Sequence, residues 1–276
     1  MAVMLHFLRY AENSNDTRFL NNDALIDFVK SRDSSQLRSM LGSYSDMRSM
    51  TSYISSDESA QTQGVLSEMQ QIVREIFVGN FCKKGTLSLR NLVKEKGGRK
   101  IFIEYDLSYG EMLTPIYSLM FDMAIKEALG RNRSEGNVYF ITDEFRLLPN
   151  LQHIDDAVNF GRSLGIRFMI GIQNVEQIYD IYGQERTHSI LSGFLTSLNF
   201  RVNDPKSRGF IKELFGRNRK IEVYATTVQS KGMIEERRDG YVVEDWDVTN
   251  LNIGQAIIGF PEYEPFVFQF DLWDAQ

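Results

Sequence analysis

From residue 100 onwards, short apolar runs alternate with stretches of helical periodicity, and this alternation limits the possible folds more than any other feature of the sequence. Runs that are apolar throughout are typical of strands buried on both faces of a sheet. Helices between such strands indicate the crossover connections that join parallel neighbours. The pattern therefore predicts an α/β layer sandwich with a mostly parallel sheet. Its strands are expected at residues 100–105, 138–142, 166–172 and 197–202.

The segments between the predicted strands carry apolar residues at helical spacing. One helix is expected to open at Pro115 and to run to Gly130, because proline is favoured at the first helical position. Two further helices are expected at residues 151–163 and 175–182. Beyond Arg219 the pattern changes to short β-like runs, which are expected to complete the edge of the sheet, at residues 222–228, 256–259 and 266–270.

The first 114 residues contain no proline, so helices there can run without interruption. Residues 23–30 are expected to form a short helix capped by Asn21 or Asn22, and residues 64–79 a longer amphipathic helix. The polar stretch 43–63 between them is expected to be a loop with frayed helix. The chain is therefore expected to divide into a partial all-α domain and an α/β domain, at residues 1–90 and 91–276.

Composition excludes several classes of protein. Of the 276 residues, 42% are hydrophobic and 25% are charged, which fits neither a disordered nor a fibrous chain. The 31 Lys and Arg residues against 37 Asp and Glu give a net charge of −6, so any contact with DNA must be local. Cys82 is the single cysteine, and three dispersed histidines give no zinc-ligand spacing. Because no apolar stretch approaches the ~20 residues that span a bilayer, a soluble chain from a reducing compartment is expected.

The most distinctive motif is a predicted strand that ends in two adjacent carboxylates, Asp143 and Glu144. Ligands of open α/β sheets bind off the carboxyl ends of the strands. One carboxylate placed there can hold Mg²⁺, and a second can orient and deprotonate an attacking water. This is the logic of the Walker B motif in nucleotide hydrolases, with Asp143 as the metal residue and Glu144 as the catalytic one. The alternative is that both carboxylates merely end the strand in solvent.

Two polar residues extend this motif. Gln173 follows the next predicted strand at the same sheet edge, where its amide can contact a γ-phosphate or hold a water. Arg162 lies in a glycine-flanked turn between the two strands and is expected near that edge. A guanidinium there can stabilise the charge of phosphoryl transfer, in its own subunit or in a neighbouring one. The plainer explanations are a solvated glutamine and an arginine that interacts with a helix dipole.

A series of short motifs follows in a characteristic order: Asp143-Glu144-Phe145, Gly161-Arg162-Ser163, Gly165-Ile166-Arg167, Ile172-Gln173-Asn174 with Gln177, Tyr182-Gly183, Asn203-Asp204-Pro205 and Leu214-Phe215-Gly216. In order and spacing this series resembles the C-terminal motor region of VirD4/TraG/TraD-type coupling proteins. The resemblance covers roughly residues 95–270. Upstream, the stretch leading into Gln63-Gly64-Val65 looks like the last part of the all-α domain of those proteins.

The resemblance implies a RecA-like P-loop NTPase sheet, incomplete here, and a ring-forming ATPase. Such a motor uses ATP and Mg²⁺ to move DNA, with a bound relaxase, towards a type IV secretion channel at the cytoplasmic face of the bacterial membrane. It also implies the roles of particular residues. Asp143 and Glu144 would be the Walker B pair, Arg162 an arginine finger that acts in the adjacent subunit, and Gln173 a polar residue on the γ-phosphate side.

One departure from the family qualifies this interpretation. A phosphate-binding loop requires Gly-x-x-x-x-Gly-Lys-Ser/Thr, and no segment of the chain has this pattern. In the family this loop and the membrane anchor lie before the all-α domain, so the chain resembles a C-terminal fragment and is expected to be inactive by itself. The strand that bears the loop would leave an empty place in the sheet. Residues 3–8, or a neighbouring chain, are the candidates to fill it.

Alternative interpretations stay open. The basic residues between 201 and 220, of which Arg217, Arg219 and Lys220 are the candidates, can bind DNA phosphates, line a subunit interface or simply form a solvated helix face. The whole chain can instead be a non-catalytic docking module, in which the helical N-terminal part and the acidic surface recognise a relaxase or a secreted protein. A VirB4-like secretion ATPase is a further alternative, but the motifs around Arg162 and Gln173 favour the coupling type.

Overall fold

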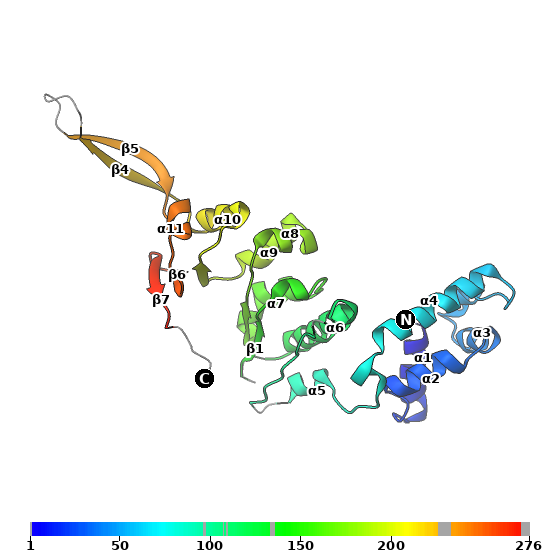
Figure 1. The fold of residues 1–276 in the computed structure, drawn as a ribbon. Coiled ribbons are helices and arrows are strands. Elements are labelled where there is room, and N and C mark those ends of the chain that lie inside the picture. Colours follow the sequence, from blue (N-terminus) through cyan, green and yellow to red (C-terminus); the bar gives the residue numbers. More distant parts are fainter. Residues whose placement is uncertain are drawn as a thin grey trace. The chain divides into compact units, whose positions relative to one another are not determined.

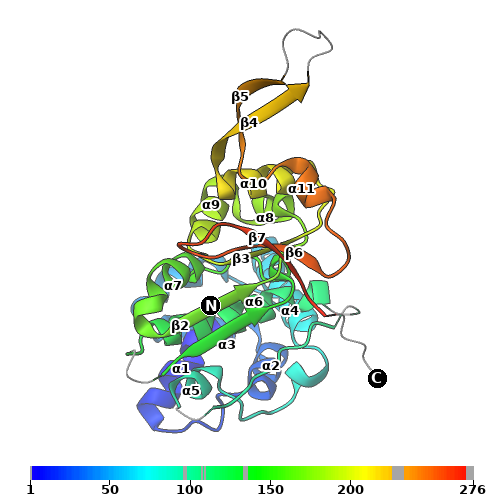
Figure 2. The same cartoon turned by 90° about the vertical axis from the view of Figure 1, so that its left-hand side faces the viewer.

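The computed structural model describes residues 2–95, 98–106, 108, 110–132, 136–225 and 233–271. The chain forms two compact units, which are drawn together in Figures 1 and 2. The first unit consists of Met1–Leu89 and Ile101–Ile116, and the second of Arg90–Lys100 and Tyr117–Gln276. The stretch after residue 100, which the sequence assigned to the α/β domain, therefore belongs in part to the first unit.

The first unit is all-helical. It contains helices α1 (Ala2–Ser14), α2 (Asn22–Ser31), α3 (Ser34–Gly42) and α4 (Ala60–Ile76), with the 3₁₀ helices η1 (Arg48–Tyr53) and η2 (Gly79–Cys82). The helices predicted at residues 23–30 and 64–79 are confirmed as α2 and α4. The Asn21 side chain caps α2 by accepting a hydrogen bond from the Ala24 N–H. The core of the unit is formed by buried residues of α3 and its neighbours, namely Leu37, Leu41, Met47 and Ile54.

The expectation that residues 3–8 might supply a missing strand is wrong. These residues lie within helix α1. Val3 and Leu5 pack partly buried against the core of the first unit, so the apolar run serves helix packing. No strand from this part of the chain is available to the sheet.

The second unit begins with short helix α5 (Leu89–Lys94) and the end of helix α6 (Gly110–Leu129). A parallel strand pair follows, formed by β1 (Val138–Thr142) and β2 (Ile166–Ile170), with Val138 opposite Ile166 and Thr142 opposite Ile170. Between and after these strands lie η4 (Phe145–Leu147), α7 (Ile154–Phe160), η5 (Gly161–Leu164), α8 (Val175–Tyr182) and α9 (Gln184–Ser192). These elements confirm the predicted alternation of strands and helices.

The remaining strands form two separate antiparallel sheets. Strand β3 (Ser197–Phe200) pairs with β6 (Gln255–Gly259), which pairs in turn with β7 (Phe266–Gln269). Strands β4 (Arg217–Ala225) and β5 (Met233–Tyr241) form a hairpin, flanked by α10 (Pro205–Phe215) and α11 (Asp245–Thr249). The late strands were expected to complete the parallel sheet. That expectation is wrong, because among the described residues none of them is hydrogen-bonded to β1 or β2.

One predicted strand is missing, and one predicted helix boundary is displaced. The strand predicted at residues 100–105 does not form, and Phe102 is 88% exposed. An extended run becomes a strand only when a neighbouring strand satisfies its backbone. Helix α6 begins at Gly110, so Pro115 lies inside the helix and does not open it. The cost is one backbone hydrogen bond, since proline has no N–H to donate to the preceding turn.

The core of the second unit lies between the β1–β2 pair and the surrounding helices. Ile125 and Ala128 of α6, Phe140 of β1 and Ile154 of α7 are buried together there. The rings of Phe140 and Phe168, which face each other across the strand pair, stack with centroids 5.0 Å apart. This packing holds the two parallel strands in register. Across the described ranges, no helix is long and apolar enough to cross a membrane.

Candidate functional site

The carboxyl ends of the parallel strands β1 and β2 lie at the same edge of the strand pair, and the sequence placed the candidate residues at this edge. The Gly171 N–H donates to the Thr142 carbonyl at 2.7 Å, and the Phe145 N–H donates to the Gly171 carbonyl at 3.0 Å. The two chains thus stay paired beyond the strands. Asp143 and Glu144 on one side and Gln173 on the other leave the sheet at the same edge, as the sequence predicted.

Gly171 makes this close pairing possible. A Cβ atom at this position would lie 2.1 Å from the carbonyl oxygen of Asp143, a distance that no real side chain tolerates. Only glycine lets the two backbones approach so closely. Sequence reasoning did not single out Gly171, although a glycine at the end of an apolar run is a known sign of close backbone approach.

Each of the two carboxylate oxygens of Glu144 has a side-chain partner. The Gln173 Nε2 donates a hydrogen bond to Glu144 Oε2 at 2.5 Å, and Arg146 Nε lies 3.3 Å from Glu144 Oε1. The Glu144 side chain is 18% exposed, so it is mostly shielded but reachable from solvent. The structure therefore brings Glu144 and Gln173 together and adds Arg146, which the sequence analysis missed.

Asp143 differs from its neighbour. It is exposed, and no described side chain forms a hydrogen bond or an ion pair with its carboxylate. No group of three or more His, Cys, Asp or Glu side chains that could hold a metal occurs in the described ranges. Mg²⁺ is commonly held by one or two carboxylates, several waters and substrate phosphates. Asp143 fits that mode of binding, and the described residues offer no complete metal cage.

The segment after Glu144 is anchored in the core. Phe145 is fully buried, and its ring stacks on Tyr182 of α8 with centroids 5.5 Å apart. The Tyr182 hydroxyl donates to the carbonyl of Leu148, and burial raises the pKa of Tyr182 to about 12. The hydroxyl thus stays protonated and continues to donate at physiological pH. These contacts fix the backbone from which Glu144 points.

Arg162 is not at this edge. It lies in η5, and Gly165, which ends η5, accepts a hydrogen bond from the N–H of Val138 at the start of β1. Because parallel strands begin at the same edge, the turn before β2 lies at the amino ends of both strands. The expectation that Arg162 lies near the carboxyl edge of its own chain is therefore wrong. Its side chain is exposed at the opposite edge.

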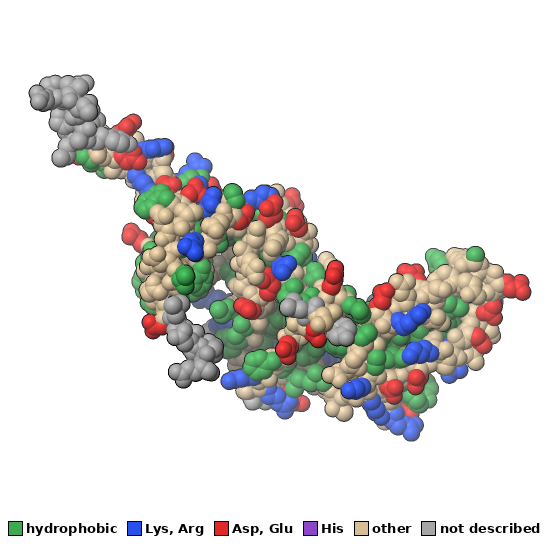
Figure 3. All heavy atoms as spheres, in the orientation of Figure 1, with side chains coloured by type: hydrophobic (Ala, Val, Ile, Leu, Met, Phe, Trp, Pro, Cys, Tyr) green, Lys and Arg blue, Asp and Glu red, His purple; other side chains and the backbone are tan. Residues whose placement is uncertain are grey.

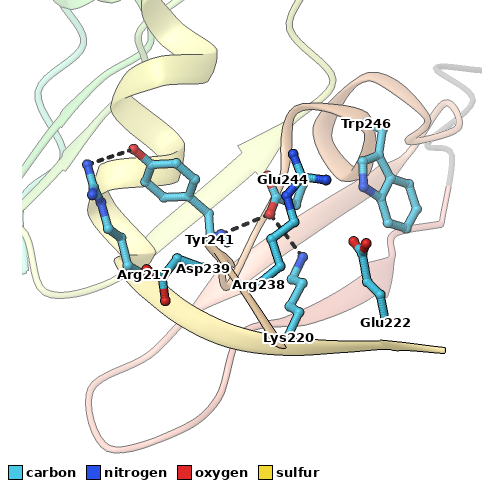
Figure 4. A pocket seen from close by; sticks show the side chains of 9 residues that line it. Arg217, Lys220, Glu222, Arg238, Asp239, Tyr241, Glu244 and Trp246 are labelled. Atoms are coloured by element: carbon cyan, nitrogen blue, oxygen red, sulfur yellow. Dashed lines mark hydrogen bonds and ion pairs between the residues drawn. The ribbon is translucent and has the colours of Figure 1, made fainter. Parts of the chain in front are cut away.

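The basic candidates Arg217, Arg219 and Lys220 lie on strand β4, and not on a helix face. Arg217 and Lys220 line an open pocket of about 500 Å³ at the base of the β4–β5 hairpin, as Figure 4 shows, whereas Arg219 is not among the residues that line it. Lys220 Nζ lies 3.1 Å from Glu244 Oε1, and Arg217 lies over the ring of Tyr241. The charged residues that line the pocket are three cations and three acids, namely Arg217, Lys220, Arg238, Glu222, Asp239 and Glu244.

The balance of charge in this pocket decides whether it can bind the phosphates of a nucleic acid. An electrostatic site for a nucleic acid needs an excess of positive charge. In this pocket the charges balance, and Lys220 already has an acidic partner. Binding of DNA by Arg217, Arg219 and Lys220 stays a prediction.

The parallel strand pair, its covering helices and the polar edge define a mixed α/β protein, and its fold matches that of solved coupling-protein structures. TrwBdeltaN70, a bacterial conjugative coupling protein, superposes on 99% of the chain with a TM-score of 0.77 at 18% sequence identity. TrwB in complex with ADP and Mg²⁺ superposes on the same share with a TM-score of 0.74 and 18% identity.

The model of the type IV secretion-system coupling protein DNA-binding domain matches residues 3–267, and the chain belongs to this family. Over 124 residues, which are 44% of the chain, it is 27% identical to the coupling protein TraD of Escherichia coli (strain K12). The resemblance found in the sequence is confirmed. The chain spans 62% of the TrwB structure and 17% of TraD, so it corresponds to part of each.

Proposed function

We propose that the chain is the Walker B and sensor part of an ATP-hydrolysing motor that moves DNA in conjugation. The observation that carries the proposal is the hydrogen bond from Gln173 to Glu144 at the carboxyl edge of a parallel strand pair. Conjugative coupling is the role of the family to which the chain belongs. TrwB structures with ADP and Mg²⁺ and with a non-hydrolysable ATP analogue support nucleotide binding by proteins of this fold.

Each residue at the carboxyl edge has a different role in the proposed reaction. Asp143, which has a free carboxylate, would hold Mg²⁺, which in turn would neutralise charge on the phosphates. Glu144 would accept a proton from the attacking water, and Gln173 would fix the Glu144 carboxylate and sense the γ-phosphate. Asp143 thus fits the part of such a site that binds the metal, and Glu144 fits the part that activates the water. The sequence of 276 residues contains no phosphate-binding loop, so the triphosphate would be held by residues from outside it.

Arg162 has a place in this proposal only between subunits. It is exposed at the edge opposite Glu144, so it cannot reach a nucleotide bound beside Glu144 of the same chain. In a homo-oligomeric ring the amino edge of one subunit can face the carboxyl edge of the next. Arg162 would then act as an arginine finger in that neighbour's site.

The proposal is tested in the complete coupling protein by Glu144→Gln, with Glu185→Gln as the matched control. Glu185 is exposed on α9, away from the strand ends. We expect Glu144→Gln to abolish DNA transfer while binding of a relaxase persists, and Glu185→Gln to leave both unchanged. Normal DNA transfer by the Glu144→Gln variant would refute the catalytic role.

A second candidate function is docking of a partner protein by the first unit. The observation that favours it is an apolar pocket of about 390 Å³ lined by residues of α1, α3, η1 and α4. Three methionines, Met40, Met50 and Met69, line it, and flexible thioethers suit binding of varied apolar side chains. Deletion of residues 15–80 should then abolish relaxase binding and spare the nucleotide site. Both functions can coexist in one protein at the cytoplasmic face of the membrane.

A further inference from the structure

The carboxylate of Glu144 has a neutral partner on one oxygen and a cation on the other. The Gln173 Nε2 donates to Oε2 at 2.5 Å, and the Arg146 Nε lies 3.3 Å from Oε1. A general base needs an oxygen that is open to the water from which it takes the proton. The partner that leaves more easily therefore decides which oxygen of Glu144 meets the water.

The ion pair with Arg146 is the weaker of the two contacts. Its separation exceeds the about 2.7–2.9 Å of a strong charge-assisted hydrogen bond, and the Arg146 side chain is 45% exposed. Exposed ion pairs contribute little to stability, because water solvates both charges. Among the described residues, Glu144 is the only partner of the Arg146 guanidinium. The guanidinium can therefore leave Oε1 easily, while the Gln173 amide stays on Oε2.

The backbone that carries Arg146 is fixed. Phe145 is fully buried against the ring of Tyr182, and the Tyr182 hydroxyl donates to the carbonyl of Leu148. Arg146 lies between these two anchored positions, within the short helix η4. A rotation of its side chain thus moves the charge without any change in the backbone. Glu144, on the other side of the buried ring, keeps its place during this movement.

A phosphate group is the ligand that suits this guanidinium. Ligands of open α/β sheets bind at the carboxyl edge, where Arg146 and Glu144 meet. The planar fork of an arginine matches two phosphate oxygens. If Glu144 activates the water that attacks a γ-phosphate, a cation beside Oε1 lies within side-chain reach of that phosphate.

The distribution of charge elsewhere makes a single cation important. The chain has a net charge of −6, and Figure 3 shows acidic and basic side chains interspersed over the face in view. Phosphates are attracted over a distance only by a broad field of one sign. A phosphate at the carboxyl edge therefore depends on individual, well-placed cations. Arg146 is at this edge, whereas Arg162 is at the opposite one.

We propose that Arg146 binds the γ-phosphate of ATP in its own chain and thereby exposes Glu144. Without nucleotide the guanidinium pairs with Oε1, and in the nucleotide complex it pairs with the γ-phosphate. Oε1 then accepts a proton from the attacking water, whose oxygen bonds to the γ-phosphorus as the bond from that phosphorus to ADP breaks. This role rests on the proposed function and adds to it a residue that recognises the γ-phosphate.

Equilibrium binding of nucleotides to the complete coupling protein tests this role. Arg146→Ala should weaken binding of a non-hydrolysable ATP analogue at least about tenfold, through loss of a charged hydrogen bond. Binding of ADP should not change, because ADP has no γ-phosphate. Arg146→Lys should bind the analogue more tightly than Arg146→Ala, since the ammonium keeps the charge. Arg74→Ala is the matched control, because Arg74 is exposed on α4 of the first unit.

Competition for Arg146 provides a second measurement. Glu144→Gln removes the negative charge that holds the guanidinium in the empty protein. This variant should therefore bind the analogue more tightly, by up to about fivefold, which is the most that an exposed ion pair contributes. The gain should be smaller when Glu144→Gln is combined with Arg146→Ala. In ATP hydrolysis, Arg146→Ala should lower kcat/KM.

Three results would overturn the role of Arg146. They are analogue binding by Arg146→Ala as tight as that by Arg74→Ala, an equal loss for ADP and the analogue, and faster hydrolysis with unchanged analogue binding. The last result would show that Arg146 only restrains Glu144. All three leave the proposed function intact as long as Glu144→Gln abolishes hydrolysis. A natural coupling protein that binds neither nucleotide would overturn the proposed function and this role together.

Discussion

Gln173 and Glu144, which are 29 positions apart in the sequence, are joined by a 2.5 Å hydrogen bond from Nε2 to Oε2. The bond follows from the parallel pairing of β1 and β2, because both residues leave the sheet at its carboxyl edge. It gives the catalytic candidate a defined orientation before any nucleotide arrives. Such preorganisation is what a general base needs, since a misplaced carboxylate loses most of its effect.

Gly171→Ala should disturb this arrangement. The new Cβ would lie 2.1 Å from the Asp143 carbonyl oxygen, so the backbone at the end of β1 must move. We expect a loss of about 1–3 kcal/mol in the free energy of unfolding, measured by urea denaturation. Gly209→Ala is the control, because it places a methyl group in open space within helix α10 and should stabilise by about 0.5–1 kcal/mol. Equal stability of the two variants would contradict the close approach.

The purified 276-residue chain should hydrolyse ATP no faster than its own Glu144→Gln variant. The physical reason is that no loop in the sequence can cradle the triphosphate with backbone amides and a lysine. A coupled assay of phosphate release measures the rate. Turnover by the natural chain that disappears on Glu144→Gln would show that the chain binds the triphosphate without such a loop.

The proposed action of Arg162 between subunits makes a specific prediction for mixtures. In the complete protein, Arg162→Ala should reduce ATP hydrolysis by at least about 10³-fold and Glu144→Gln by about 10²–10⁴-fold. Mixed rings should regain activity, because some sites then combine a natural Glu144 with a natural Arg162 from the next subunit. Absence of recovery, with mixed rings demonstrated by mass spectrometry, would exclude a contribution of Arg162 to the adjacent site.

Asp204 should make the stability of helix α10 dependent on pH. Hydrogen bonding with the Ser207 side chain, and then with the Ser207 N–H, which donates to Oδ2 at 2.6 Å, lowers the pKa of Asp204 from its ordinary value of 3.8. The carboxylate therefore stabilises the fold above pH 3.8, and the contribution is lost as the pH falls through the lower folded-state pKa. Asp204→Ala should cost about 1 kcal/mol at pH 7. Thermal unfolding should show this difference shrinking below pH 3.8, and a constant difference would contradict the assignment.

Sequence alone was sufficient where a pattern depends on neighbouring residues or on strand direction. The run that became β1 is apolar throughout, and a strand that ends in Asp143 must deliver that residue to the carboxyl edge. Gln173 was placed correctly for the same reason, because parallel strands share their edges. The family resemblance also followed from local motifs, and the match over residues 3–267 confirms it.

Sequence failed where the outcome depends on what a segment can pair with. Residues 100–105 have the apolar pattern of a strand, but the described chain offers them no partner strand. Arg162 was assigned to the wrong edge, because a turn before a strand lies at the end opposite the residues that follow it. Pairing is a tertiary property, which periodicity does not encode.

The most direct test of the nucleotide site is a double-mutant cycle of Glu144→Gln and Gln173→Ala, measured as DNA-stimulated ATP hydrolysis by the complete coupling protein. Glu144→Gln should lower the rate by about 10²–10⁴-fold. If Gln173 acts by holding the Glu144 carboxylate, the double variant should be no slower than Glu144→Gln alone. Independent, multiplicative losses, or an unchanged rate in Glu144→Gln, would contradict a single site shared by these two residues.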